Sequence, residues 1–265
     1  MLVTTRAGRW AVWTLFGALF LPLFALPLLV VLAASFAGNW SGALPSAPTL
    51  EHYATATRGE ALAALGTSLA TALLASLAAL ALGTWAALAA ERLPRPARRI
   101  LDAVFVLPVA VPSVVVGLAV LVAFSRPPLL LNGTAPIVIL AHTVLVTAFA
   151  HQSVGAALRR LDPAYAQAAA SLGASPARVL WRVRLPLLLP SLGAAAGLCF
   201  ALSMGELSAT MMLYPPDWLP LPVLVFTATD RGSLFSGSAL AVILMATTVL
   251  ALLAVSRIRN RAAHR

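Results

Sequence analysis

The chain has 265 residues, of which 61% are hydrophobic and 10% charged, and its formal net charge is +10. A soluble domain carries about 25% charged residues, so this composition excludes an ordinary soluble protein and predicts an all-α, polytopic membrane protein. The net charge by itself would also fit a nucleic-acid-binding protein, but the positions of the arginines argue against that class.

Residues 1–60 contain a basic tail, a long apolar run and the first break in hydrophobicity. The run from Trp10 to Phe36 is longer than the roughly 7–15 apolar residues of a signal peptide. Because about 20 residues cross a bilayer, we expect a retained first transmembrane helix, kinked at Pro22 and Pro27. Residues 37–60 are polar enough for an external loop with room for a short interfacial helix.

Residues 61–257 form the predicted transmembrane core, and residues 258–265 a basic cytoplasmic tail. The third predicted span contains Pro108 and Pro112. Small residues recur at every fourth position of the second span, which lets another helix approach closely in lipid; they are Ala75, Ala79, Gly83 and Ala87. The five predicted core spans are Ala61–Ala90, Leu101–Phe124, Thr134–Leu158, Ser191–Leu213 and Ser236–Ser256.

A basic, proline-punctuated loop, residues 159–190, separates the fourth and fifth spans. Asp162 is a good N-cap and Pro163 suits a first helical turn, so we expect a helix as far as Leu172, with Gly173 as its left-handed stop.

A second helix of this loop follows, because Ser175 and Pro176 repeat the start signal. Pro186 should end or kink this helix before the chain re-enters the membrane. The helix carries three arginines, which are Arg178, Arg182 and Arg184.

This loop resembles the EAA loop in the permease subunits of bacterial ABC importers. The family pattern is Glu-Ala-Ala, three residues, Gly, nine residues, Ile, one residue and Leu-Pro. The chain follows it without gaps at Gln167, Ala168, Ala169, Gly173, Val183, Leu185 and Pro186. It departs from the pattern where Gln167 replaces Glu, which removes a charge, and where Val183 replaces Ile. The resemblance implies a type I importer fold and a coupling helix that docks into an ATPase subunit, whereas the alternative is an ordinary amphipathic loop.

The arginines give the expected topology. All of the 18 basic residues except Arg58, Arg126 and Arg231 lie on one side of a six-span arrangement. By the positive-inside rule that side is cytoplasmic, so we expect the coupling loop and both termini in the cytosol. The arginines then anchor the topology and contact lipid headgroups, and nucleic acid is not expected as a partner.

The candidate solute pathway lies in the fifth span, after the coupling loop. Glu206 is the one carboxylate well inside a predicted span, and an acid in the membrane is costly enough to indicate function. The alternative is a carboxylate that only satisfies hydrogen bonds within the helix bundle. The other candidate pathway residues form a polar, flexible stretch around it and are Ser203, Gly205 and Ser208.

No catalytic or metal-binding pattern accompanies these residues. His142 and His151 are nine positions apart, about 900° of helical rotation, so they point to opposite faces and we expect packing or hydrogen-bonding roles. The one cysteine, Cys199, is expected to pack in an apolar run. Without a lysine the chain has no Walker A motif, so ATP and Mg²⁺ must be bound by a partner subunit if ATP drives the process.

The stretch from Gly205 to Gly232 is similar to the permeases for 2-aminoethylphosphonate, a branch close to those for thiamine, iron(III), sulfate or molybdate, and polyamines. With the coupling loop, the resemblance covers about Ala61 to Arg257. It implies a multi-pass protein of the bacterial inner membrane that works with ATPase subunits, a second permease, identical or different, and a periplasmic or lipid-anchored solute-binding protein. A secondary transporter is the alternative class, although the sequence has no clear inverted repeat.

Overall fold

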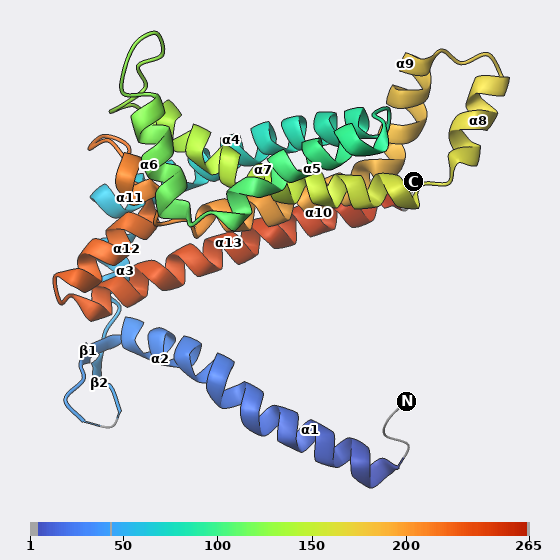
Figure 1. Cartoon of the computed structure of the whole chain (residues 1–265). Coiled ribbons are helices and arrows are strands. Elements are labelled where there is room, and N and C mark those ends of the chain that lie inside the picture. The colour runs from blue at the N-terminus through green and yellow to red at the C-terminus, as the bar shows by residue number, and fades with distance from the viewer. Residues whose placement is uncertain (1–4, 43, 264–265) are drawn as a thin grey trace. The chain divides into compact units, whose positions relative to one another are not determined.

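The computed structural model describes residues 5–42 and 44–263, which are mostly helical (Figure 1). Within these residues, five helices are long and apolar enough to cross a bilayer, or six if one bent pair is a single span. The prediction of an all-α, polytopic fold is therefore confirmed, while the count of six spans and the side of the termini stay predictions. The described chain forms two compact units, one running to Leu62 together with Leu224–Ile243, the other comprising Ala63–Val223 and the chain from Leu244.

The first unit begins with a continuous apolar helix in three parts. Helix α1 (Arg6–Phe20) passes into a π-helical segment, η1 (Leu21–Ala25), and then into α2 (Leu26–Ser35). The N–H of Leu26 donates to the carbonyl of Leu21, five residues back, so the wider π turn directly before Pro27 accommodates that proline, which lacks an N–H. At the position of the expected kink, the structure therefore changes from α-helix to π-helix over five residues.

The loop after α2 contains two strands that the sequence did not predict. Strands β1 (Ala37–Asn39) and β2 (Ser46–Pro48) pair antiparallel, and the expected short helix follows as α3 (Glu51–Ala56). His52 of α3 bridges two elements of this unit, since its Nε2 lies 3.0 Å from the carbonyl oxygen of Ala37 and its Nδ1 lies 3.2 Å from Oγ of Ser236. The loop is therefore held by specific hydrogen bonds.

The second unit is built around three long helices, α4 (Gly59–Ala90), α7 (Ala135–Arg160) and α10 (Leu185–Met204). The last described helix, α13 (Leu234–Ala263), belongs to this unit from Leu244 onward. The stripe of small residues on α4 is buried and faces α7, as predicted. A Cβ on Gly83 would lie 2.7 Å from the backbone nitrogen of His151 and 2.8 Å from Cβ of Ala150. Ala79 packs in one cluster with Val146, Ala150 and Cys199. The two helix backbones are therefore close because the side chains between them are small.

The predicted third span is a broken helix in the structure. The structure has two helices here, α5 (Arg95–Ala110) and α6 (Ser113–Ala123), with axes bent by 106°. The break is at Val111, which is extended (φ −102°, ψ 134°) because a residue that precedes proline is disfavoured in the helical region. Pro108 remains inside α5, so only Pro112 interrupts the helix. The helix also starts earlier than expected, at Arg95, whereas the predicted span begins at Leu101.

The segment between Tyr214 and Phe235 contains a helix that the sequence did not indicate, α12 (Leu221–Asp230). Two hydrogen bonds fix its beginning to α4: the indole N–H of Trp218 donates to Oγ1 of Thr71 at 2.9 Å, and the N–H of Leu221 donates to Oγ of Ser68 at 2.7 Å. Hydroxyl groups of the membrane helix α4 thus accept hydrogen bonds from N–H groups at the end of the loop that precedes α12.

Candidate functional site

The loop between α7 and α10 forms the helix-turn-helix that its capping residues predict. Helix α8 (Pro163–Ser171) is capped by Asp162, whose Oδ1 accepts the N–H of Ala164 at 2.9 Å. At its end Gly173 has φ +81°, and the N–H of Ala174 donates to the carbonyl of Ala169 at 3.1 Å. This Schellman-type ending is the left-handed stop expected at Gly173.

The second helix of the loop does not end at Pro186, so one of the two outcomes predicted for this proline, an end of the helix, is wrong. Helix α9 (Pro176–Val179) starts at its cap Ser175, continues through the π-helical segment η2 (Leu180–Arg184), and joins α10 without a break. The N–H of Leu185 donates to the carbonyl of Leu180, so the wider turn directly before the proline makes room for it. The loop and the following span are therefore one continuous helix of 29 residues from Pro176 to Met204.

An ion pair ties this loop to the end of α4. The guanidinium of Arg184 in η2 donates to Oε2 of Glu91, and both side chains are about one third exposed. The tip of the loop, in contrast, presents large apolar side chains: Leu172 is 90% exposed and Tyr165 58% exposed. In Figure 1, α8 and α9 project beyond the ends of α7 and α10. The loop thus has a fixed base and an exposed apolar tip.

The motif positions are divided between these two parts. The tip carries Gln167, Ala168, Ala169 and Gly173, of which Gln167 and Gly173 are exposed, and the base carries the other three, Val183, Leu185 and Pro186. A motif spread over 20 residues therefore describes one exposed surface and its rigid connection to a membrane helix.

The predicted fifth span ends earlier than the sequence indicated. Helix α10 stops at Met204, so Glu206 lies in a break before the short helix α11 (Thr210–Leu213). Its Oε1 accepts the N–H of Ala209 at 3.0 Å, and its Oε2 accepts the N–H of Thr210 at 3.0 Å and the hydroxyl of Thr210 at 2.9 Å. The carboxylate thus satisfies backbone donors that no helix satisfies, and its place in the solute pathway stays a prediction.

A buried histidine joins this break to α10. His142 of α7 contacts Oγ of Ser203 through Nδ1 at 2.7 Å and Oγ1 of Thr210 through Nε2 at 2.8 Å. The Thr210 hydroxyl has one proton, which it donates to the carboxylate of Glu206. Its oxygen therefore accepts a hydrogen bond from the Nε2–H of His142. Nδ1 of the same ring then carries no proton and accepts a hydrogen bond from the Ser203 hydroxyl. One neutral tautomer satisfies every contact. The network holds the end of α10, the break and α7 together.

The second histidine has a different partner. Nε2 of His151 lies 2.8 Å from Oδ1 of Asp102 on α5, and the ring of Phe105 lies over the imidazole with centroids 4.9 Å apart. The sequence did not single out Asp102, although an acid four residues after Arg98 at the head of an apolar helix is a usable signal. The two histidines thus serve separate sites, as their spacing predicted.

Comparison with known proteins identifies the family. The model for the binding-protein-dependent transport system inner membrane component matches residues 79–265. The chain belongs to this family. The permease protein PhnV of Salmonella typhimurium (strain LT2), assigned to a 2-aminoethylphosphonate transport system, is 46% identical over 261 residues, which is 98% of each chain. The putrescine transport system permease protein PotI of Escherichia coli (strain K12) is 30% identical over 213 residues, 78% of this chain and 75% of PotI.

Solved permeases share the fold of this ABC importer permease. The permease in a bacterial alginate ABC transporter, solved in complex with an alginate pentasaccharide-bound periplasmic protein, superposes with a TM-score of 0.76 at 16% identity, over 96% of this chain and 94% of that one. The resemblance first indicated by the loop is therefore confirmed, and the permease is a multi-pass protein of the inner membrane class.

In this permease the four predicted pathway residues do not form one cluster. Ser203 and Glu206 meet through the contacts of His142 and Thr210, whereas Gly205 and Ser208 are exposed and lie outside that network. Sequence reasoning missed the central position of His142, because the order of the chain does not show which side chains on α10 face it.

Proposed function

We propose that this permease forms the translocation pathway of an ATP-driven importer for 2-aminoethylphosphonate. The observation that carries the proposal is the 46% identity to PhnV over 98% of both chains. Permeases assigned to other solutes match less well: PotI is 30% identical, and the molybdenum transport system permease ModB of Mycobacterium tuberculosis (strain H37Rv) is 34% identical over 57% of this chain. The difference in both identity and coverage favours the phosphonate branch.

The proposed assembly contains two permeases, identical or different, two ATPase subunits that bind ATP and Mg²⁺, and a periplasmic or lipid-anchored solute-binding protein, in the bacterial inner membrane. The exposed tip of the coupling loop, with Leu172 and Tyr165, supports docking of an ATPase, because large apolar side chains gain free energy when a partner covers them. Gln167 lies on the same tip, so the coupling contact here lacks the charge of the usual Glu.

Movement of the ATPases would act on a stiff lever. The coupling loop continues as helix from Pro176 to Met204, and the ion pair between Arg184 and Glu91 ties its base to α4. A displacement of the tip can therefore move α10 as a rigid element and bias the bundle between two states. ATP hydrolysis occurs in the partner subunit, and this chain contributes the mechanical connection.

Growth on defined phosphorus sources tests the solute. Cells that lack the gene are expected to grow on inorganic phosphate but not on 2-aminoethylphosphonate, and a plasmid copy should restore growth. Growth of the deletion strain on 2-aminoethylphosphonate, with loss of uptake of thiamine, iron(III), sulfate, molybdate or a polyamine, would contradict the solute. Uptake that continues after the ATPase gene is removed would instead favour a secondary transporter.

A further inference from the structure

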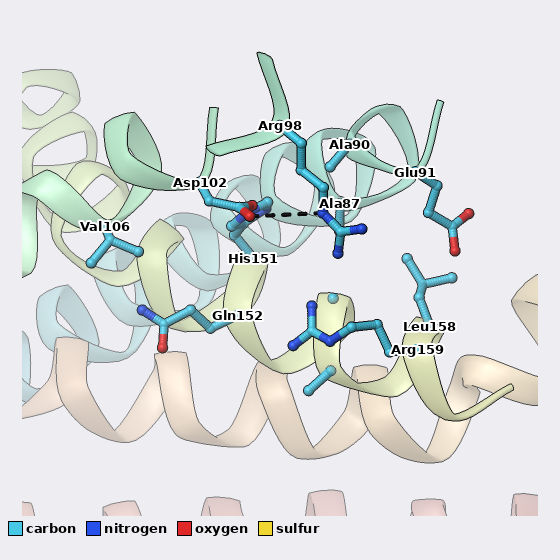
Figure 2. A pocket seen from close by; sticks show the side chains of 12 residues that line it. Ala87, Ala90, Glu91, Arg98, Asp102, Val106, His151, Gln152, Leu158 and Arg159 are labelled. Carbon is cyan, nitrogen blue, oxygen red and sulfur yellow. Dashed lines mark hydrogen bonds and ion pairs between the residues drawn. The ribbon is translucent and has the colours of Figure 1, made fainter. Parts of the chain in front are cut away.

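A charged cavity lies beside the base of the coupling loop, about 2.5 helical turns along α7 from His142. Its volume is about 610 Å³, and its wall combines the end of α4, the first turns of α5 and the second half of α7. Cavities of about 300–1,000 Å³ hold small ligands. Six charged or polar residues line it and are drawn in Figure 2: Glu91, Arg98, Asp102, His151, Gln152 and Arg159.

Both carboxylates of the cavity have basic partners. Asp102 accepts a hydrogen bond from His151 through Oδ1, and its Oδ2 lies 3.8 Å from Nε of Arg98. Glu91 is paired with Arg184, which lies outside the cavity wall. The negative charges are therefore balanced before Arg159 is counted.

The guanidinium of Arg159 has no hydrogen bond or ion pair with any side chain that the structure describes. It folds back along α7, with Nη1 3.4 Å from the position of a Cβ on Gly155. In Figure 2 the side chains of Arg98 and Arg159 extend from α5 and α7 into the same space. The cavity thus has one positive charge in excess and two guanidinium groups around it.

The wall also contains an unsatisfied polar atom. Nδ1 of His151 is buried and has no hydrogen-bond partner within the described part of the chain, and the residue is 4% exposed. Buried polar atoms are rarely left without a partner. This nitrogen is closed off from the cavity, so the charged side chains of the wall, and not Nδ1, indicate the kind of occupant.

We propose that this cavity binds a small molecule that carries a phosphonate or phosphate group and an ammonium group. The guanidinium forks of Arg98 and Arg159 suit the oxyanion, since arginine forms paired hydrogen bonds with phosphoryl oxygens. Asp102 and Glu91 in the same wall accept hydrogen bonds from the ammonium. 2-Aminoethylphosphonate carries both groups. The identification of the occupant as the transported solute rests on the proposed function. The headgroup of phosphatidylethanolamine has the same aminoethyl and phosphoryl chemistry and is the second source.

Binding to the purified importer tests the site. The complex in nanodiscs of phosphatidylglycerol alone is titrated with 2-aminoethylphosphonate and, separately, with inorganic phosphate. Arg159→Gln should weaken binding of the anion about 10- to 100-fold, the range expected when a charged hydrogen-bond partner is lost. The matched control is Arg160→Gln on the same helical turn, because Arg160 does not line this cavity, and its Kd should equal that of the wild type. Should Arg159→Gln not reach the membrane, Arg159→Lys retains the charge without the fork and should still weaken binding.

Two further measurements separate the sources. Uptake of 2-aminoethylphosphonate with a raised KM in Arg159→Gln cells identifies the solute as the occupant. Loss of phosphatidylethanolamine from the purified variant, detected by mass spectrometry, with normal uptake identifies the lipid headgroup. If wild-type cells do not import 2-aminoethylphosphonate, the proposed function fails, while phosphate binding that depends on Arg159 still supports the site. The site is overturned if solute binding, phosphate binding and lipid retention are all the same in Arg159→Gln and Arg160→Gln.

Discussion

The close contact between α4 and α7 can be tested with one methyl group. In Gly83→Ala the new Cβ would lie 2.7 Å from the backbone nitrogen of His151 and 2.8 Å from Cβ of Ala150. Contacts this short with a backbone atom require that the helices move apart. Gly66→Ala on the same helix is the matched control, since nothing lies within 4 Å of its Cβ.

The size of the effect follows from these distances. Overpacking a well-packed core costs about 1–3 kcal/mol. Replacing an unobstructed helical glycine with alanine instead gains roughly 0.5–1 kcal/mol in water. One kcal/mol corresponds to about 2–4 °C of Tm for chains of roughly this size. We therefore expect Gly83→Ala to melt roughly 2–12 °C below the wild type and Gly66→Ala at or slightly above it.

The assay can use the chain's one cysteine. Cys199 of α10 is fully buried against α4 and α7, so a thiol-reactive fluorophore should label it only when the bundle opens. Labelling of the detergent-solubilised importer is followed as temperature rises. Equal melting temperatures for Gly83→Ala and Gly66→Ala would refute the close packing of α4 against α7.

Three other changes test the loop, the break and the topology. Gly173→Asp places a side chain at φ +81°, which costs on the order of 1 kcal/mol, and adds a charge at the exposed tip. We expect normal membrane levels of this variant, but loss of transport and weaker copurification of the ATPase. Normal uptake would mean that this loop does not couple. Glu206→Gln leaves one acceptor oxygen where two now accept hydrogen bonds from N–H groups, which should destabilise the fold by about 1–3 kcal/mol and lower Tm. We also expect slower uptake. Unchanged uptake would mean that the carboxylate has a structural role alone. Reporter fusions should indicate cytosol after Arg184 and periplasm near Asp217, and a periplasmic signal at Arg184 would contradict the six-span topology.

The sequence by itself determined the features that depend on neighbouring residues. Composition determined the membrane class, because burial in lipid requires apolar side chains along the whole span. The helices of the coupling loop followed from Asp162, Ser175 and Gly173, whose side chains or missing side chain satisfy helix ends only a few residues away. The small-residue stripe on α4 likewise predicted close packing, since its period alone places it on one face.

Only the tertiary structure decided what each proline and each buried polar group does. Pro112 ends a helix and Pro186 does not, because a π-helical segment before Pro186 absorbs the missing hydrogen bond. The partners of His142 and Asp102 are 49 to 68 positions away along the chain, and helix packing brings them together. Local spacing cannot encode such contacts, since the rotation and offset of packed helices are set by all the side chains between them.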